Sequence, residues 1–412
     1  MSTDNLKGII ELGNEYFKCL IFEDTDYELP KIISSSIVPS KGISNGTITN
    51  LSEASRCIRL CVGEAEKIAN ITIKKINVVF EQPEFLCTKL SKNRKVNGTK
   101  IQRDDINFLL KEGKKQVTQN DESHKIIHIF NHNYIVDGKK FDDEPIGIYA
   151  DYLSHEMTFL TAPKSNIKNI NQTFINSDIE VERYFSSIFA LVAQLLNINE
   201  LKHGSILIDI GLEKISVGFF QNIALLNSFT IPIGINHIAK DISKVCLLDL
   251  RESQTIKNKL DFSFQNNDEL FSSDNLLKDV YFKRTNYRKI SKSLIFSIVK
   301  ARLDEVFQII KKNLYMTENK SLSTENVFIT GDGSSLSNLE NCFSNYFGLS
   351  VKKIYINSSR KNNIKLENNL DFTSCLGAIK IIREGWETEA IPVSVNEESR
   401  KIGFFQRIFG NN

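Results

Sequence analysis

Two short motifs in this sequence place a carboxylate two residues before a glycine, at the end of an apolar run. They are Glu11-Leu12-Gly13 and Asp209-Ile210-Gly211. The apolar residues on both sides of each motif predict a strand, a tight turn and a second strand. A glycine there lets backbone amides approach a phosphate, and the carboxylate can reach the metal of that phosphate through water. An ordinary hairpin is the competing interpretation, because turns favour Asp and Gly for local reasons too.

A third glycine-rich segment follows an apolar strand in residues 326–336, where Gly331-Asp332-Gly333-Ser334 forms the predicted turn. A turn of this kind allows a flat base to lie against the backbone. Strand, strand, strand and helix are predicted in this order for residues 6–69, with Asn50 as the helix N-cap, and again for residues 205–248. The repeated order suggests a duplicated α/β domain.

The composition limits the class of protein. The 412 residues exceed one ordinary core, and 41% hydrophobic with 25% charged residues is typical of a globular protein of two or more domains. A net charge of +2 argues against general nucleic-acid binding. The polar N-terminus does not resemble a signal peptide, so we expect the chain to start in the cytoplasm. We expect its seven scattered cysteines to be buried free thiols in a reducing compartment, not metal ligands.

Residues 81–163 differ in texture and predict a small inserted β/α domain. A strand is expected near residues 85–90, followed by a polar segment and a short helix over residues 104–115, with Asp104 or Asp105 near its N-cap. Several strand-like pieces separated by glycines then follow.

Three histidines in this region, His124, His128 and His132, stand four residues apart. On a helix they would line one face, and a zinc site would be the sharper interpretation. The intervening segment is rich in isoleucine, which favours a strand and ordinary structural histidines. Residues 131–133 are expected to form a turn.

Residues 251–314 predict a mainly helical region. The helix expected over residues 293–314 has an apolar stripe of Leu294, Ile298, Ala301, Val306, Ile309 and Ile310. A basic cluster precedes it, consisting of Lys283, Arg284, Arg288, Lys289 and Lys292. A solvated face and a docking surface for an acidic partner are both compatible with this cluster.

The segment over residues 400–412 combines an aromatic apolar face with basic flanks. The apolar side chains are Ile402, Phe404, Phe405, Ile408 and Phe409, and the flanking cations are Arg400, Lys401 and Arg407. After the polar linker of residues 387–399, this pattern is typical of a helix that lies in a membrane interface. Docking back on the same protein is the alternative, against which the linker argues.

The order of these motifs resembles the actin, sugar-kinase and heat-shock ATPase superfamily, and within it the FtsA family of bacterial division proteins. The resemblance covers nearly the whole chain. It depends on the residues 8–13, 39–46, 124–130, 209–211, 232–234, 330–331 and 377, together with the terminal amphipathic segment.

The resemblance implies an actin-like, ribonuclease H-like fold of two duplicated α/β lobes with a small inserted SHS2-type domain. The first lobe would comprise residues 1–80 and 164–197, and the inserted domain residues 81–163. The second lobe would comprise residues 198–245 and 326–386, with a helical subdomain over 246–325. A disordered linker over 387–399 and a membrane-targeting helix over 400–412 would complete the chain.

The family also implies a nucleotide site, with ATP and Mg²⁺ between the two lobes. The positions that match the family's site are Gly13, Asn14, Glu15, Lys18, Asp209, Gly211, Leu212, Lys214, Gly234, Lys257, Gly331, Asp332, Gly333 and Ser334.

Several of these positions depart from the family pattern. Asn14 and Tyr16 replace a Thr or Ser and a Lys, while Leu212, Glu213 and Lys214 replace two glycines and a threonine. Gln254 stands for the glutamate of the base pocket, and Asp332 stands where a second glycine is common. A side chain at 212 limits backbone approach, and Glu213 places a negative charge beside a polyphosphate. The sequence therefore predicts at most a weak ATPase, with a structural role.

The resemblance further implies a protein that polymerises on anionic lipids at the cytoplasmic face of the inner membrane, at the division site. It would anchor the C-terminal tail of FtsZ through the region matching 241–326, where Arg284, Arg288, Lys289 and Lys292 suit an acidic tail by charge. Other division proteins would bind the inserted domain. A degenerate phosphotransferase and a peptide-binding relative from pilus assembly are the alternatives, although no general base stands out.

Overall fold

The computed structural model describes residues 6–24, 30–282, 289–315, 326–354 and 372–386, together with residues 389 and 391. The chain divides into two compact units. The first contains residues 1–204, 218–228 and 356–412, and the second contains residues 205–217 and 229–355.

The first unit is built on a five-stranded sheet in the order β11-β6-β1-β2-β3. Its strands are β1 (Leu6–Leu12), β2 (Tyr16–Glu23), β3 (Lys31–Pro39), β6 (Lys75–Phe80) and β11 (Glu180–Ser186). The first three pair in antiparallel fashion, while β6 runs parallel to both β1 and β11. A small hairpin of β4 (Ile43–Ser44) and β5 (Thr47–Ile48) follows β3.

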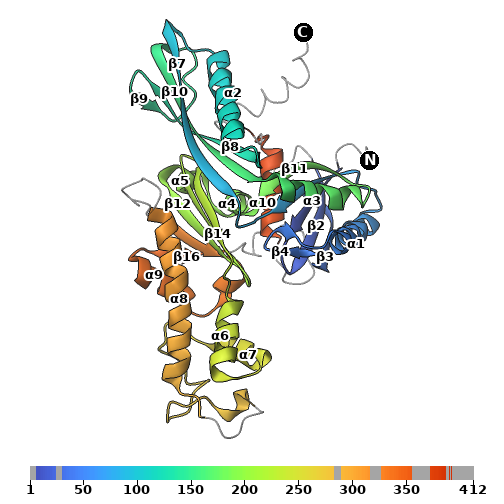
Figure 1. Cartoon of the computed structure of the whole chain (residues 1–412), viewed down its shortest axis with the longest axis vertical. Helices are drawn as coiled ribbons and strands as arrows, with labels where there is room; N and C mark the ends of the chain where they lie inside the picture. The colour runs from blue at the N-terminus through green and yellow to red at the C-terminus, as the bar shows by residue number, and fades with distance from the viewer. Residues whose placement is uncertain are drawn as a thin grey trace. The chain divides into compact units, whose positions relative to one another are not determined.

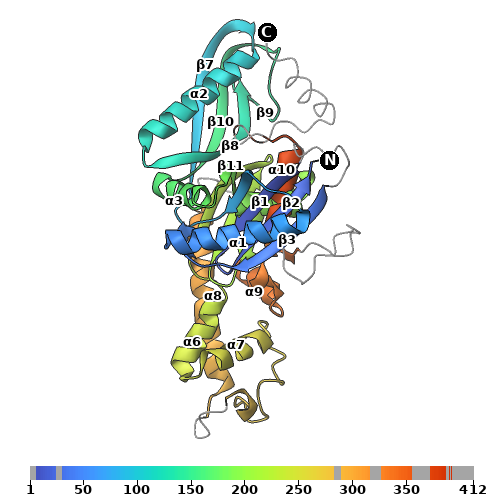
Figure 2. The same cartoon turned by 90° about the vertical axis from the view of Figure 1, so that its right-hand side faces the viewer.

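Four helices pack around this sheet. They are α1 (Leu51–Ala69), α3 (Lys164–Ile175), α4 (Ser187–Leu195) and α10 (Thr373–Arg383), with α5 (Ile198–His203) after α4. Figure 2 shows α1 lying across β2 and β3. Asn50 caps α1 as predicted, since its side chain accepts a hydrogen bond from Glu53 N at 3.1 Å. Near the end of this helix, Ile68 is 66% exposed.

The inserted region forms a separate four-stranded sheet in the order β7-β10-β8-β9, with α2 (Arg103–Asn120) packed on it (Figure 1). The strands are β7 (Leu86–Lys100), β8 (His124–Val136), β9 (Lys139–Phe141) and β10 (Tyr149–Pro163). The core between sheet and helix includes Ile106, Leu109, Tyr134 and Leu153.

Three predictions for this region are corrected by the structure. The polar segment after residue 90 continues β7, because it pairs with β10. The turn predicted at residues 131–133 is instead a bulge within β8, where the register against Glu156 and Met157 shifts. The helix predicted over residues 104–115 extends to Asn120, whereas the acidic residues do lie near its N-cap, Gln102, as predicted. Asp105 occupies the third helical position, where its carboxylate accepts from Gln102 N at 2.8 Å. A strand partner and a capping box decide features that local composition leaves open.

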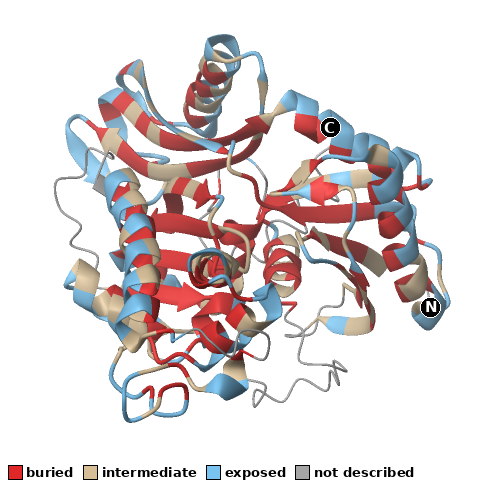
Figure 3. Cartoon of the chain, turned by 60° about the horizontal axis from the view of Figure 1, so that its bottom comes forward, coloured by how far each residue is buried: buried red, intermediate tan, exposed pale blue. Residues whose placement is uncertain are grey.

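The second five-stranded sheet repeats the topology of the first, in the order β14-β13-β12-β15-β16. Its strands are β12 (Ser205–Ile210), β13 (Ile215–Gln221), β14 (Ala224–Ile231), β15 (Asn326–Thr330) and β16 (Val351–Lys353). As in the first sheet, three consecutive strands are followed by two later ones that run parallel, here β12 with β15 and β15 with β16. The strands β1, β2 and β6 of the first sheet and β12 to β15 of the second are buried along most of their length (Figure 3).

The helices of the second unit are α6 (Asn236–Cys246), α7 (Leu250–Lys259), α8 (Lys292–Tyr315) and α9 (Leu339–Phe347). Two short 3-10 helices, η2 (Asp279–Tyr281) and η3 (Asp332–Ser335), lie between them in the chain. In α8 the buried face differs from the predicted stripe. Its buried members are Ile295, Val299, Leu303, Val306, Phe307, Ile310 and Leu314, whereas Leu294 and Ala301 are exposed. Both sets repeat at helical spacing in a sequence that is apolar on more than one side, so only the packing partners select the face.

Candidate functional site

The two carboxylate-x-glycine motifs form turns of the same geometry in the two units. A Cβ atom on Gly13 would lie 2.6 Å from Tyr16 O, and one on Gly211 would lie 2.8 Å from Lys214 O. In the second unit, Gly211 N also donates to Lys214 O at 2.9 Å. Only glycine tolerates so close a backbone approach, which gives each motif a structural reason for its glycine.

In the first unit a neighbouring loop closes on the turn. Asn14 Nδ2 donates to Asn45 Oδ1 at 3.1 Å, and Ser40 N donates to Glu15 O at 2.8 Å. Lys18 is paired with Glu11, its direct partner across β1 and β2, with 3.4 Å between Nζ and Oε2. The amine of Lys18, a predicted nucleotide-binding residue, therefore forms an ion pair with Glu11 on the neighbouring strand.

In the second unit the turn rests on the start of α6. Ile235 N donates to Gly211 O at 3.1 Å, and Asn236 N donates to Leu212 O at 2.8 Å. A Cβ atom on Gly234 would lie 2.4 Å from Leu212 O, so this predicted glycine allows α6 to approach the turn.

Glu213 points its carboxylate at α6. It accepts hydrogen bonds from Lys240 Nζ at 2.7 Å and from Asn236 Nδ2 at 3.1 Å. Partial burial alone would raise the pKa of Glu213, but these two hydrogen bonds and the charge of Lys240 hold it below its usual value. Lys257, which is buried, donates to Asn236 Oδ1 at 3.3 Å. The negative charge of Glu213 thus has a cationic partner inside its own unit.

The third motif packs against the end of β12. Gly331 has φ +86°, and a Cβ there would lie 2.3 Å from Asp209 Oδ1, while one on Gly333 would lie 2.5 Å from Ile210 Cγ2. Ser334 is fully buried, and its Oγ donates to Gly331 O at 2.7 Å. Thr330 is the direct neighbour of Asp209 across β12 and β15. The second unit therefore brings the predicted residues at 209–214, 234 and 331–334 onto connected turns, to which Lys257 of α7 is linked through Asn236.

Sequence reasoning missed the partners of Glu213. Asn236 and Lys240 lie four residues apart on one side of the first two turns of α6, which begins directly after the predicted glycine turn. The sequence signal that could have identified these partners is a Lys four residues after the Asn of Gly234-Ile235-Asn236. Sequence reasoning also missed Arg302 of α8. Its guanidinium donates two hydrogen bonds to the carboxylate of Asp241, from Nε to Oδ2 at 2.6 Å and from Nη2 to Oδ1 at 2.9 Å.

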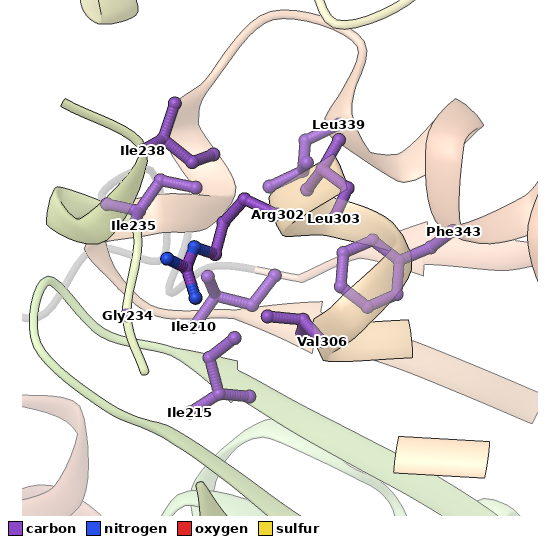
Figure 4. A pocket seen from close by; sticks show the side chains of 10 residues that line it. All are labelled: Ile210, Ile215, Gly234, Ile235, Ile238, Arg302, Leu303, Val306, Leu339 and Phe343. Carbon is purple, nitrogen blue, oxygen red and sulfur yellow. The ribbon is translucent and has the colours of Figure 1, made fainter. Parts of the chain in front are cut away.

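A cavity of about 20 Å³ lies beneath these turns, between α6, α8 and α9 (Figure 4). Its lining is apolar apart from Arg302, and includes Ile210, Ile238, Val306 and Phe343. Because the guanidinium of Arg302 is already bonded to Asp241, this space is a packing gap of the second unit and not a phosphate site.

The remaining predicted sites are described only in part. Lys289 is exposed, and Lys292 Nζ lies 5.8 Å and 5.5 Å from the ring centroids of Phe271 and Phe296. Lys283, Arg284 and Arg288 lie outside the described residues. So do all the predicted membrane-binding residues, namely Ile402, Phe404, Phe405, Arg407, Ile408 and Phe409.

The predicted structural histidines and buried cysteines can be compared with the structure. His128 is fully buried in β8, where its Nε2 accepts from Ser186 N at 3.1 Å, and burial lowers its pKa to about 3. Within the described ranges, no three His, Cys, Asp or Glu side chains are arranged to hold a metal ion. None of the seven cysteines, all of which are described, forms a disulfide, and five of them are buried. None of the described helices is long and apolar enough to cross a membrane.

Comparison with known proteins identifies the family. A model of the cell division protein FtsA matches residues 206–377, and a model of the SHS2 domain inserted in FtsA matches residues 86–161. The chain belongs to the FtsA family. FtsA of Buchnera aphidicola subsp. Baizongia pistaciae is 24% identical over 386 residues, covering 91% of this chain and 90% of that protein. FtsA of Bacillus subtilis is 25% identical over 320 residues, covering 76% and 70%.

Solved structures place this FtsA-family chain in the actin-like fold. The PilM–PilN type IV pilus biogenesis complex gives a TM-score of 0.56 at 12% identity, over 84% of this chain and 87% of that one. MreB5 of Spiroplasma citri, solved with ADP, gives 0.50 at 12% identity, over 92% and 99%. The predicted actin-like α/β fold with an SHS2 insertion is thus confirmed.

Proposed function

We propose that this chain is a division scaffold that attaches to the inner membrane, self-associates and anchors FtsZ at the division site. Membership of the FtsA family supports a role in cell division. The observation that carries the proposal is the inserted domain, because residues 86–161 match the model of the SHS2 domain inserted in FtsA. This favours a division scaffold over a phosphotransferase or a pilus-assembly protein of the same fold. Later division proteins would bind through this domain.

We further infer that ATP with Mg²⁺ binds at the glycine turns. The glycine turns at 211–214 and 331–334 supply close-approaching backbone, and Lys214 and Lys257 supply positive charge. In the first unit, residues 13–15 and Lys18 would take the corresponding role. When bound, the nucleotide supplies phosphates whose charge Mg²⁺ neutralises. These residues can accommodate a polyphosphate because Lys240 already neutralises the negative charge of Glu213. We expect slow hydrolysis, since Leu212 and Glu213 replace glycines at the turn.

Membrane attachment is the part of the proposal that the sequence of residues 400–412 supports. The aromatic face would enter the interface, while Arg400, Lys401 and Arg407 would meet anionic headgroups. The full chain should sediment with vesicles that contain phosphatidylglycerol. The triple substitution Phe404→Glu, Phe405→Glu and Phe409→Glu should abolish this sedimentation. Pelleting of the triple variant at the level of the original chain would overturn the proposal.

A further inference from the structure

The chain beyond α10 returns to the inserted sheet. Trp386 is 5% exposed, and its ring stacks on Phe189 with 5.9 Å between centroids and 21° between planes. The backbone N–H of Trp386 donates to Ile381 O at 3.1 Å, and its backbone carbonyl accepts from Arg183 Nη2 at 2.7 Å. The end of α10 is therefore fastened to α4 and β11, both of which belong to the first unit.

Ile391 is then paired with the edge of β8. Ile391 N donates to Ile129 O at 2.7 Å, and Asn131 N donates to Ile391 O at 2.8 Å, which forms a parallel bridge opposite Phe130. Its side chain is fully buried. The strand β9 pairs with Tyr134–Val136, further along the same edge of β8. Ile391 therefore pairs with a part of this edge that β9 does not cover.

Two further features favour this docking. Glu389 forms an ion pair with Lys114 of α2. Pro392 follows Ile391 in the sequence. A proline biases the residue before it towards an extended backbone, which is the conformation that a β-bridge needs. Having no N–H, the proline also cannot donate the next hydrogen bond to a strand.

We propose that Trp386, Glu389 and Ile391 form a strap that moves the attachment point of the C-terminal segment from the end of α10 to the β8 edge of the inserted domain. This inference rests on the proposed lipid binding of residues 400–412. With the strap docked, only residues 392–399 separate the inserted sheet from the lipid-binding segment. Eight residues span at most about 28 Å, and the sixteen residues 384–399 span at most about 56 Å. The strap therefore holds the inserted domain close to the lipid surface.

The ion pair and the position of the sole tryptophan provide direct readouts of the strap. A zero-length carbodiimide reagent should join Lys114 to Glu389 in the full chain, as detected by peptide mass spectrometry. The cross-link should form to the same extent with and without phosphatidylglycerol vesicles. Acrylamide should quench the Trp386 fluorescence weakly in both conditions. Absence of the cross-link, or its loss when vesicles bind, would overturn the proposal.

A matched pair of variants isolates the docking. Ile391→Asp places a charge in the buried site and should reduce the cross-link at least tenfold, with faster hydrogen exchange at the Asn131 amide. Val395→Asp replaces another β-branched residue by Asp, four residues later in the chain, and should leave both readouts unchanged. Equal behaviour of the two variants would refute the strap. The cross-link formed without vesicles tests the strap alone, whereas sedimentation tests lipid binding alone. The two experiments therefore distinguish failure of the strap from failure of the proposed lipid binding.

Discussion

The carboxylate of Glu213 is the residue whose charge bears most directly on the proposed nucleotide site. It lies on the turn that would hold a phosphate, and Lys240 Nζ is 2.7 Å from it. Because the pKa of Glu213 is lowered, the carboxylate is charged at neutral pH. The group contributes stability above its ordinary pKa and loses that contribution as the pH falls through the lowered value.

Substitution Glu213→Gln should tighten nucleotide binding. It removes a negative charge beside the phosphates and frees the Lys240 amine, while Asn236 can still bond to the amide. We expect the dissociation constant of a fluorescent ATP analogue with Mg²⁺ to fall about fivefold to tenfold, equivalent to about 1 kcal/mol. Lys240→Gln should raise it. An unchanged constant in both variants would place the nucleotide elsewhere.

A second residue, His155, should govern part of the acid sensitivity. It is fully buried and stacks on Tyr134 with 4.3 Å between ring centroids, and neither ring nitrogen has a hydrogen-bond partner among the described residues. Burial lowers its pKa to about 3. The unfolded chain therefore takes up the proton first, so the contribution of neutral His155 is complete above about pH 6.5 and is lost as the pH falls towards 3.

Replacement of His155 by Phe should keep the ring stacking and remove this titration. Between pH 7 and pH 5 the variant should lose about 1–2 kcal/mol less of its free energy of unfolding than the original chain. Urea denaturation at the two pH values measures the difference. Identical losses for the two proteins would mean that His155 does not remain neutral in the folded state.

At the scale of elements, the contact between α4 and α10 depends on one glycine. A Cβ atom on Gly377 would lie 1.8 Å from Ala190 O, so α10 approaches the backbone of α4 more closely than any side chain allows. In Figure 1 the two helices lie side by side, and α10 also leads into the strap. The sequence motif at Gly377 is therefore explained by packing.

Gly377→Ala should lower the free energy of unfolding by about 3 kcal/mol, because backbone must move to accommodate the methyl group. Gly63→Ala provides the control. Gly63 also lies inside a helix, but no neighbouring atom lies within 4 Å of its would-be Cβ. There alanine should stabilise the protein by about 0.5–1 kcal/mol. Chemical denaturation of both variants tests the contrast, and similar effects would refute it.

At the scale of the whole molecule, two sheets of the same strand order carry the duplicated turns. This duplication places a carboxylate and a glycine at the end of the first strand of each sheet. The second unit also carries the helical region that we propose as the docking surface for the acidic FtsZ tail. Of the basic cluster in that region, Lys289 and Lys292 are described: Lys292 begins α8 and Lys289 precedes it by three residues.

The double substitution Lys289→Glu and Lys292→Glu should weaken binding of a labelled FtsZ tail peptide at least tenfold in fluorescence anisotropy. Lys312→Glu is the control, because Lys312 is exposed on the same helix but lies about 30 Å further along it. That separation exceeds the screening length of about 8 Å at physiological salt. Equal affinities for the double variant and the control would remove this surface from the proposal.

The sequence by itself determined the elements whose signals are local. The apolar runs around Gly13 and Gly211, the Asn50 cap and the isoleucine-rich strand at His128 depend on neighbours within a few residues, so they were predictable. Tertiary structure decided the rest. The bulge at residues 131–133 depends on pairing with β10, the charge state of Glu213 depends on Lys240, and the buried face of α8 depends on what packs against it. Ile391 occupies the β8 edge for the same reason, because its partner lies some 260 residues earlier in the chain.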